Sequence, residues 1–159
     1  MRAPKPSPRR GVRMVDVGGK PATMREAVAA GCIRMSPTVL ALIARGDLPK
    51  GDALAAAEIA GVMAAKATPH LLPLCHPVAF SAAEVEATCD PDLPGVRVQA
   101  RVRGKAQTGY EMEALAAVSV ALLTIYDMAK ALAPGMAITE IAVQSKAGGK
   151  SGKWVRKAA

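Results

Sequence analysis

The apolar residues between positions 108 and 130 follow a helical repeat. Those that recur at steps of three and four in TGYEMEALAAVSVALLTIYDMAK are Leu115, Val118, Leu122, Ile125 and Ala129. This is the period of a helix that turns one face toward a core. The two ends of the segment are charged, with Glu111 and Glu113 at its start and Asp127 and Lys130 at its end. The pattern therefore predicts one long core helix with a charged group at each end.

Apolar and polar residues alternate in three other segments. They are AEVEATC at 83–89, GVRVQARV at 95–102 and AITEIAV at 137–143. A period of two is typical of strands with one buried face. The turn-forming residues of DPDLPG at 90–95 and APGM at 133–136 mark their limits. We therefore expect a strand in each segment.

Two further helices are indicated by residues that cap helix ends. Ser36 followed by Pro37 is a helix start, and that helix should end near Gly46. Asp52 should cap a second helix over ALAAAEIAGVMAAKA, at 53–67.

The order of these elements predicts the fold class. Helices come first, then two neighbouring strands, the long helix and a last strand. This order favours an α+β domain with helices packed on one face of an antiparallel sheet. At the start of the long helix, Thr108 and Glu111 have the spacing of a capping box, which would give Glu111 a purely structural role.

Length and charge divide the chain of 159 residues into three parts. Residues 1–13 and 144–159 each carry five basic and no acidic side chains, whereas the middle carries 11 basic against 13 acidic ones. We expect a disordered basic arm at 1–13, an α+β domain at 14–146, where any catalytic site would lie, and a flexible tail rich in Gly and Lys at 147–159. No uninterrupted apolar run approaches the ~20 residues of a membrane span, and no export signal is evident. The cytoplasm is the expected compartment, without membrane contact.

The segment LLPLCHPV, at 71–78, is a candidate binding turn. Its two flanking prolines fix the backbone around Cys75 and His76. A packed turn with a surface histidine is an equally good interpretation of this motif alone. A metal site built from His70, Cys75 and His76 is disfavoured, and no metal is predicted. Cys75 is a poor candidate nucleophile, because adjacent side chains such as that of His76 rarely aim at one another.

Asp127 and Lys130 are candidates for chemistry because they lie three residues apart on the long helix. A surface ion pair is the simplest interpretation. The charge-free stretch between Ala114 and Tyr126 favours instead a partly buried pair, which could move protons or hold a developing negative charge. Basic residues at element boundaries would form a polyphosphate site if they converged. They are Arg25, Lys50, Lys66 and Lys146.

Together these motifs resemble the molybdenum cofactor biosynthesis protein C family, the cyclic pyranopterin monophosphate synthases. The resemblance runs from MVDVGGK at 14–20 to KAGGKSG at 146–152 and includes MREA, KGD, AEIAGVMAAK, LPLCHP, TGYEMEAL and LTIYDMAK. LPLCHP combined with the EMEAL-to-YDMAK helix is its most specific part. Tyr110, Ala147 and the Lys153–Trp154 pair depart from the expected family pattern.

The resemblance implies a lyase. Its substrate would be (8S)-3',8-cyclo-7,8-dihydroguanosine 5'-triphosphate, a small molecule derived from a purine triphosphate. Its products would be cyclic pyranopterin monophosphate and diphosphate. The implied catalytic pair is Asp127 and Lys130. The implied substrate-binding residues are Leu74, Cys75, His76, Met112, Glu113, Glu111, Arg25, Lys50, Lys66 and Lys146, with the cations facing the triphosphate.

The resemblance also implies a ferredoxin-like fold, a homohexamer built as a trimer of dimers, and no redox cofactor. The sequence gives no indication for or against a magnesium requirement. Along a helix, the side chains of Glu113 and Asp127 would lie about 21 Å apart and only about 40° apart around the axis. If both contact one substrate, the active site must join two chains at a dimer interface.

Two other functions compete with the lyase. A basic ferredoxin-like RNA-binding module is suggested by the pI of about 9.8, but one Phe, one Trp and two Tyr leave few aromatic rings for base stacking. We therefore expect no nucleic-acid partner. A catalytically silent subunit of a pterin pathway is the other alternative, and the intact Asp127 and Lys130 argue against it.

Overall fold

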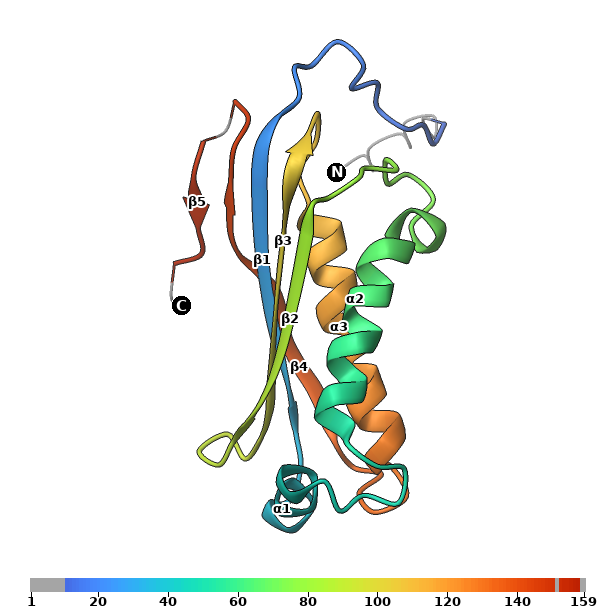
Figure 1. Ribbon diagram of the computed structural model, residues 1–159, viewed down its shortest axis with the longest axis vertical. Coiled ribbons are helices and arrows are strands. Elements are labelled where there is room, and N and C mark those ends of the chain that lie inside the picture. Colours follow the sequence, from blue (N-terminus) through green and yellow to red (C-terminus); the bar gives the residue numbers. More distant parts are fainter. Residues whose placement is uncertain (1–10, 151, 158–159) are drawn as a thin grey trace, which may run out of the picture.

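A computed structural model describes residues 11–150 and 152–157 and shows a sheet covered by helices on one face (Figure 1). All strand pairs are antiparallel, in the order β2-β3-β1-β4-β5. The strands are β1 (Thr23–Arg34), β2 (Ala82–Asp90), β3 (Gly95–Ala106), β4 (Ala137–Ala147) and β5 (Trp154–Val155). The helices are α1 (Pro37–Arg45), α2 (Ala53–Leu71) and α3 (Glu111–Ala129). The order 4-1-3-2 of the first four strands is that of a ferredoxin-like sheet, so the predicted α+β class is confirmed.

The predicted strands at 83–89, 95–102 and 137–143 are confirmed as β2, β3 and β4. The predicted helix caps are confirmed as well. The Ser36 side chain accepts a hydrogen bond from the Val39 amide, and Gly46 ends α1 with a φ of 72°. Asp52 accepts hydrogen bonds from the amides of Leu54 and Ala55 at the start of α2. Local side-chain chemistry therefore decides where these helices begin.

Strand β1 has no counterpart among the elements that the sequence pattern predicts. It is the central strand, paired with β3 on one side and β4 on the other. Its middle residues from Ala27 to Ile33 are almost all buried, so apolar residues do not alternate with polar ones. The small residues Ala29 and Gly31 also lack the β-branched character that marks a strand. Pairing on both edges, which is a long-range property, places this segment in the sheet.

The capping box predicted at Thr108 and Glu111 is wrong. Tyr110 is the N-cap of α3, and no side-chain hydrogen bond caps the helix there. Glu111 instead pairs with Lys146 on β4, at 2.8 Å between Lys146 Nζ and Glu111 Oε1. Glu111 is therefore free to have a role beyond helix capping.

The predicted arm and the predicted tail lie partly outside the described residues. Of the arm at 1–13, only residues 11–13 are described, and they are exposed. Within the tail at 147–159, Trp154 and Val155 pair with Lys146 and Ser145 to extend the sheet.

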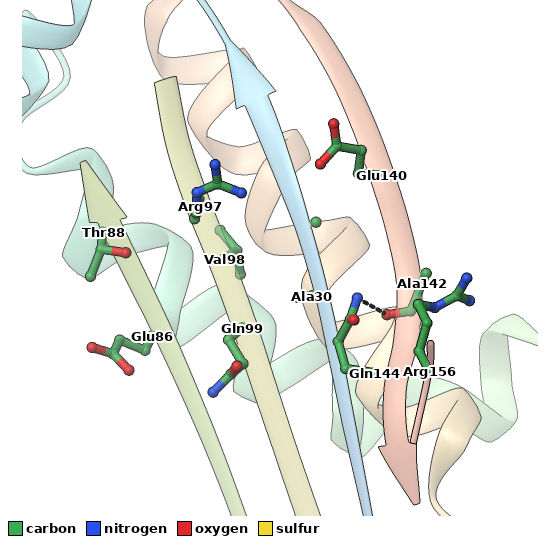
Figure 2. A pocket seen from close by; sticks show the side chains of 11 residues that line it. Ala30, Glu86, Thr88, Arg97, Val98, Gln99, Glu140, Ala142, Gln144 and Arg156 are labelled. Carbon is green, nitrogen blue, oxygen red and sulfur yellow. Dashed lines mark hydrogen bonds between the residues drawn. The ribbon is translucent and has the colours of Figure 1, made fainter. Parts of the chain in front are cut away.

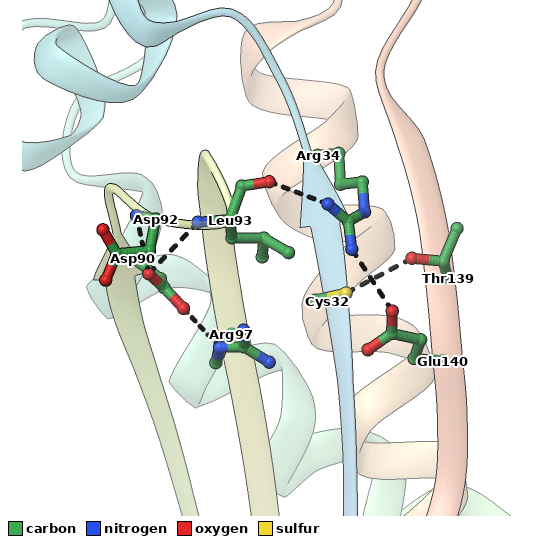
Figure 3. Close-up of polar contacts among 8 residues, drawn as sticks. All are labelled: Cys32, Arg34, Asp90, Asp92, Leu93, Arg97, Thr139 and Glu140. Atoms are coloured by element: carbon green, nitrogen blue, oxygen red, sulfur yellow. Dashed lines mark hydrogen bonds and ion pairs between the residues drawn. The ribbon is translucent and has the colours of Figure 1, made fainter. Parts of the chain in front are cut away.

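The turn between β2 and β3 is held by polar contacts at one end of the sheet (Figure 3). The Asp90 carboxylate accepts hydrogen bonds from the amides of Asp92 and Leu93 and pairs with Arg97. This arginine holds the pKa of Asp90 below its usual value. Arg34 donates to the Leu93 carbonyl at 2.8 Å, which ties the end of β1 to the same turn.

Helices α2 and α3 lie side by side on the sheet, and small residues let them approach closely (Figure 1). A Cβ atom at Gly61 of α2 would lie 2.9 Å from a Val85 methyl carbon and 3.1 Å from the Ala117 carbonyl oxygen. Both distances are shorter than ordinary van der Waals contacts. Gly61 therefore sets how closely α2 meets α3 and β2.

Helix α3 is long and apolar enough to cross a membrane. It is nevertheless a core helix, because a row of its side chains is buried against the sheet and α2. The buried residues are Glu113, Ala114, Ala117, Val118, Ala121, Leu122, Ile125 and Ala129.

We predict that Gly61→Leu lowers the free energy of unfolding by about 2 kcal/mol. The added side chain overpacks the contact between the two helices, and this cost exceeds the ~1 kcal/mol that a better helix former contributes. Denaturant unfolding would measure the change. Ala55→Leu, at an exposed position of the same helix, is the matched control and should change stability by less than ~0.5 kcal/mol. Equal stability of both variants would show that α2 does not pack tightly against α3 and β2 at Gly61.

Candidate active site

The carboxylate of Asp127, at the end of α3, lies between two lysines. Lys130 Nζ donates to Asp127 Oδ1 at 2.7 Å, and Lys50 Nζ donates to Asp127 Oδ2 at 2.6 Å. Lys50 also donates to the Asp127 backbone carbonyl at 3.2 Å. Lys50 belongs to the loop between α1 and α2, so the tertiary fold brings it to Asp127 across 77 positions of sequence. We call Lys50, Asp127 and Lys130 the lysine–aspartate cluster.

The two lysines determine the charge states in this cluster. Hydrogen bonds and Coulomb attraction from Lys130 and Lys50 lower the pKa of Asp127 to about 2. In return, the Asp127 carboxylate raises the pKa of Lys130. Asp127 is therefore ionised and Lys130 protonated throughout the neutral range. The cluster carries one net positive charge.

The expectation that Asp127 and Lys130 are partly buried is wrong for the single chain. Their side chains are 53% and 55% exposed. Only one face of α3 is buried, and this face includes Ala129 in the last turn. Asp127 and Lys130 lie on the exposed side. In one chain the cluster therefore forms an open, positively charged surface.

The other end of α3 carries a buried carboxyl group. Glu113 is 1% exposed, and its Oε1 lies 3.9 Å from the Cys75 sulfur. Burial, followed by the nearby charge of Glu111, raises the pKa of Glu113. Among the described residues, Glu113 Oε2 has no hydrogen-bond partner. This end of the helix thus offers a buried carboxyl group with one free oxygen.

The turn that carries Leu74, Cys75 and His76 packs beside Glu113. Burial and the Glu113 carboxylate raise the pKa of the Cys75 thiol, which agrees with the expectation that Cys75 is a poor nucleophile. His76 Nε2 lies 2.6 Å from the Val15 carbonyl, and because a carbonyl can only accept, this nitrogen carries the proton. Leu74 is 44% exposed and can contact a ligand.

The predicted phosphate-binding cations do not converge on one point of the chain. Lys50 belongs to the lysine–aspartate cluster. Lys146 pairs with Glu111 at the opposite end of α3. Lys66 is exposed on α2, and its side chain makes no hydrogen bond or ion pair with the described residues. One chain therefore holds these cations in separate places.

Arg25 lies on β1 near the Glu113 end of α3. Its Nε and Nη2 atoms donate to the carbonyls of Ala106 and Gln107, at 3.0 and 3.2 Å. The backbone of Gly149 passes so close that a Cβ there would lie 2.5 Å from Arg25 Nη1. The adjacent glycines of KAGGKSG, at 146–152, therefore pack on Arg25.

A cavity of about 320 Å³ adjoins Arg25. Its wall includes Lys20, Thr23 and Lys150, none of which was assigned to the site from sequence. Thr23 Oγ1 is buried and has no hydrogen-bond partner among the described residues. The glycines beside Lys20 and Lys150 in MVDVGGK and KAGGKSG were the signal that could have indicated this cavity.

A second hollow, of about 830 Å³, lies on the sheet face away from the helices (Figure 2). Arg97, Gln99 and Glu86 from β3 and β2 point into it, together with Glu140 and Gln144 from β4. None of the site residues predicted from the sequence lines it.

Among the described residues, no group of three or more His, Cys, Asp or Glu side chains is placed to hold a metal ion.

Comparisons with known proteins agree with the resemblance seen in the sequence. A family model described as the MoaC family matches residues 14–149. The chain is 56% identical to a cyclic pyranopterin monophosphate synthase of Nostoc sp. over 142 residues, which cover 89% of this chain and 84% of the relative. It is 53% identical to the synthase of that name from Trichodesmium erythraeum over 146 residues, with coverages of 92% and 88%. The corresponding protein of Chloroflexus aurantiacus is 56% identical over 144 residues, with coverages of 91% and 88%.

We predict that Glu113→Gln stabilises the folded chain increasingly as the pH rises above ~4.3, the ordinary pKa of a glutamate. The raised pKa of Glu113 means that the folded state holds this proton more tightly than the unfolded state. The wild type therefore loses stability as the pH rises through the folded pKa, with a slope of at most ~1.4 kcal/mol per pH unit. The neutral glutamine does not have this loss.

Denaturant unfolding between pH 4.5 and 8 would measure this difference. Glu84→Gln, at an exposed carboxylate on β2, controls for the loss of one negative charge. If the difference in the free energy of unfolding between Glu113→Gln and the wild type stays constant over this pH range, the pKa of Glu113 is not raised in the folded chain.

Proposed function

Because the chain belongs to the MoaC family, we propose that it is a cyclic pyranopterin monophosphate synthase, a lyase of molybdenum cofactor biosynthesis. Its substrate is the cyclised dihydroguanosine triphosphate named above, and it releases diphosphate. The observation that carries this proposal is the lysine–aspartate cluster on an exposed surface, where an anionic substrate can reach it.

In this proposal Asp127 and Lys130 have different tasks. A carboxylate with a pKa of about 2 is too weak a base to remove protons efficiently at neutral pH. It holds the two lysines in place instead. Lys130, whose pKa is raised, keeps its proton and acts mainly as a fixed positive charge. It stabilises the negative charge that develops on substrate oxygens when the rings open and the cyclic phosphate closes.

The Glu113 end of α3 suits the heterocycle of the substrate. A buried carboxyl group with a free oxygen is a partner for the polar edge of a purine-derived ring, and an exposed leucine can cover the ring face. Leu74, Cys75, His76, Met112 and Glu111 complete this part of the pocket. The cations Arg25, Lys50, Lys66 and Lys146 hold the phosphates, where charge-assisted hydrogen bonds give the strongest contacts.

The separation of the two ends of α3 supports an active site shared by two chains. The helix places Glu113 about 21 Å from Asp127, which is too far for one small substrate within a single chain. A two-fold axis can bring the lysine–aspartate cluster of one chain to the Glu113 end of another. We propose a dimer with two such sites, and a hexamer assembled as a trimer of dimers, in the cytoplasm and without a redox cofactor.

The decisive test is release of diphosphate from the cyclised guanosine triphosphate by the purified protein, with and without magnesium. We predict that Lys130→Ala lowers turnover by at least ~100-fold while the protein stays folded, because an exposed ion pair adds little stability. Lys130→Arg keeps the positive charge and should retain more activity than Lys130→Ala.

Arg45→Ala removes another exposed, paired cation and is the matched control, with unchanged turnover. Absence of diphosphate release by the wild type under every divalent-ion condition would overturn the proposed function. Full activity of Lys130→Ala would reduce the cluster to a surface ion pair.

We also predict that two inactive variants restore activity when they share a dimer. Glu113→Ala and Asp127→Ala proteins are unfolded together and refolded as a mixture. In a mixed dimer, one site inherits both defects and the other inherits neither. Random pairing then gives roughly a quarter of wild-type activity under two-fold symmetry.

A mixture of Asp127→Ala and Lys130→Ala is the matched control. Both changes lie in the same cluster, so every site keeps one defect and activity should stay absent. Native mass spectrometry would show that mixed dimers formed in both experiments. If the Glu113→Ala and Asp127→Ala mixture is as inactive as its parents despite such dimers, each site lies within one chain.

A further inference from the structure

Tyr110, at the start of α3, is fully buried and contacts the segment that follows the candidate binding turn. Its hydroxyl donates a hydrogen bond to the Ala79 carbonyl at 2.8 Å. The next residue, Phe80, meets the tyrosine ring edge-on, with the ring centres 6.4 Å apart and an angle of 88° between the planes. Such an arrangement is favourable beyond the burial of the two rings. One side chain thus joins the first turn of α3 to residues close behind Cys75 and His76.

The backbone of β3 packs closely against the tyrosine hydroxyl. A Cβ atom at Gly104 of β3 would lie 2.6 Å from this oxygen and 3.0 Å from the Phe80 Cα. The Ser81 amide and hydroxyl both donate to the Arg103 carbonyl, at 2.9 and 3.0 Å. The segment from Ala79 to Ser81 is therefore held against β3 at one end and by Tyr110 at the other.

The Tyr110 hydroxyl also lies close to charged groups of the candidate site. Burial and the nearby Glu113 carboxylate raise the pKa of Tyr110, and Arg25 opposes this shift. The phenol therefore keeps its proton and stays a donor to Ala79. Because α3 has no side-chain cap, the buried tyrosine also fixes where the helix begins and hence where Glu113 lies.

We propose that Tyr110 is a positioning residue, which holds the turn with Cys75 and His76 in register with Glu113. Its hydroxyl is already bonded to the Ala79 carbonyl, so this side chain acts through the turn and not by binding the substrate. Its consequence for catalysis depends on the proposed function, but its effect on the turn does not. Tyr110 departs from the expected family pattern. Its hydrogen bond to Ala79 is the role that we propose for a tyrosine at this position.

The test is the alkylation rate of Cys75 by iodoacetamide in Tyr110→Phe, measured by peptide mass spectrometry. Cys89, which is also half-buried, is the internal reference. Loss of the hydroxyl should raise the ratio of Cys75 to Cys89 alkylation by about fivefold, the change that a hydrogen bond of ~1 kcal/mol corresponds to. A general loss of stability would raise both rates and leave their ratio unchanged, which would overturn the proposal.

Tyr126→Phe is the matched control. It removes the chain's other tyrosine hydroxyl, which donates to the Pro134 carbonyl at 2.9 Å near the opposite end of α3. The alkylation ratio should not change in this variant. In the diphosphate assay, Tyr110→Phe should raise KM by about fivefold and change kcat less, because a loosened turn weakens substrate binding. An increased alkylation ratio in a protein that never releases diphosphate would support the positioning role and overturn the proposed function alone.

A measurement on the wild type covers the case in which Tyr110→Phe does not fold. The amides of Cys75 and Ser81 donate to backbone carbonyls at 3.1 and 2.9 Å. If Tyr110 holds this segment, both amides should exchange hydrogen at least tenfold more slowly than unstructured peptide. Exchange at the rate of a free peptide would contradict the proposal.

Discussion

Helix α3 is buried against the sheet on one side and against α2 on another, and its length is fixed by its backbone hydrogen bonds. Small residues such as Gly61 and Ala117 let the two helices and β2 approach closely, so the helix has little freedom to shift. The carboxyl groups of Glu113 and Asp127 both belong to this rigid helix, so their relative positions are fixed. The distance between its two charged ends is therefore a fixed property of the fold, and it is what makes a site within one chain difficult to build.

The two ends of α3 differ in their contact with water, and this difference sets their chemistry. Glu113 is enclosed by protein, so its ionised form is disfavoured. Asp127 is exposed and hydrogen-bonded to two lysines, so its ionised form is favoured. Two carboxyl groups on one helix thus have opposite pKa shifts. A buried carboxyl group with a raised pKa suits recognition of a polar ring edge, whereas an ionised carboxylate between lysines suits the placement of positive charge.

The binding turn depends on contacts that arrive from several directions. Prolines restrict its backbone, but they do not decide where it lies. Tyr110 from α3 and Arg103 from β3 hold the segment that follows it, and the Val15 carbonyl contacts His76 from the N-terminal side. A turn supported in this way can present Leu74 and His76 to a ligand without much loss of conformational freedom on binding.

The sequence by itself determined the features that depend on local chemistry. Ser36, Asp52 and Gly46 mark helix ends because their side chains or backbone angles satisfy nearby backbone groups. Alternation identified β2, β3 and β4, and the order of elements gave the fold class. Motifs such as LPLCHP indicated the family. The tertiary structure alone decided that β1 is a central strand, because its partners lie on both sides and remove the alternating pattern. The tertiary structure also brought Lys50 to Asp127, left both side chains exposed and buried Glu113. Contacts and exposure of this kind depend on residues far apart in the chain, which no local pattern records.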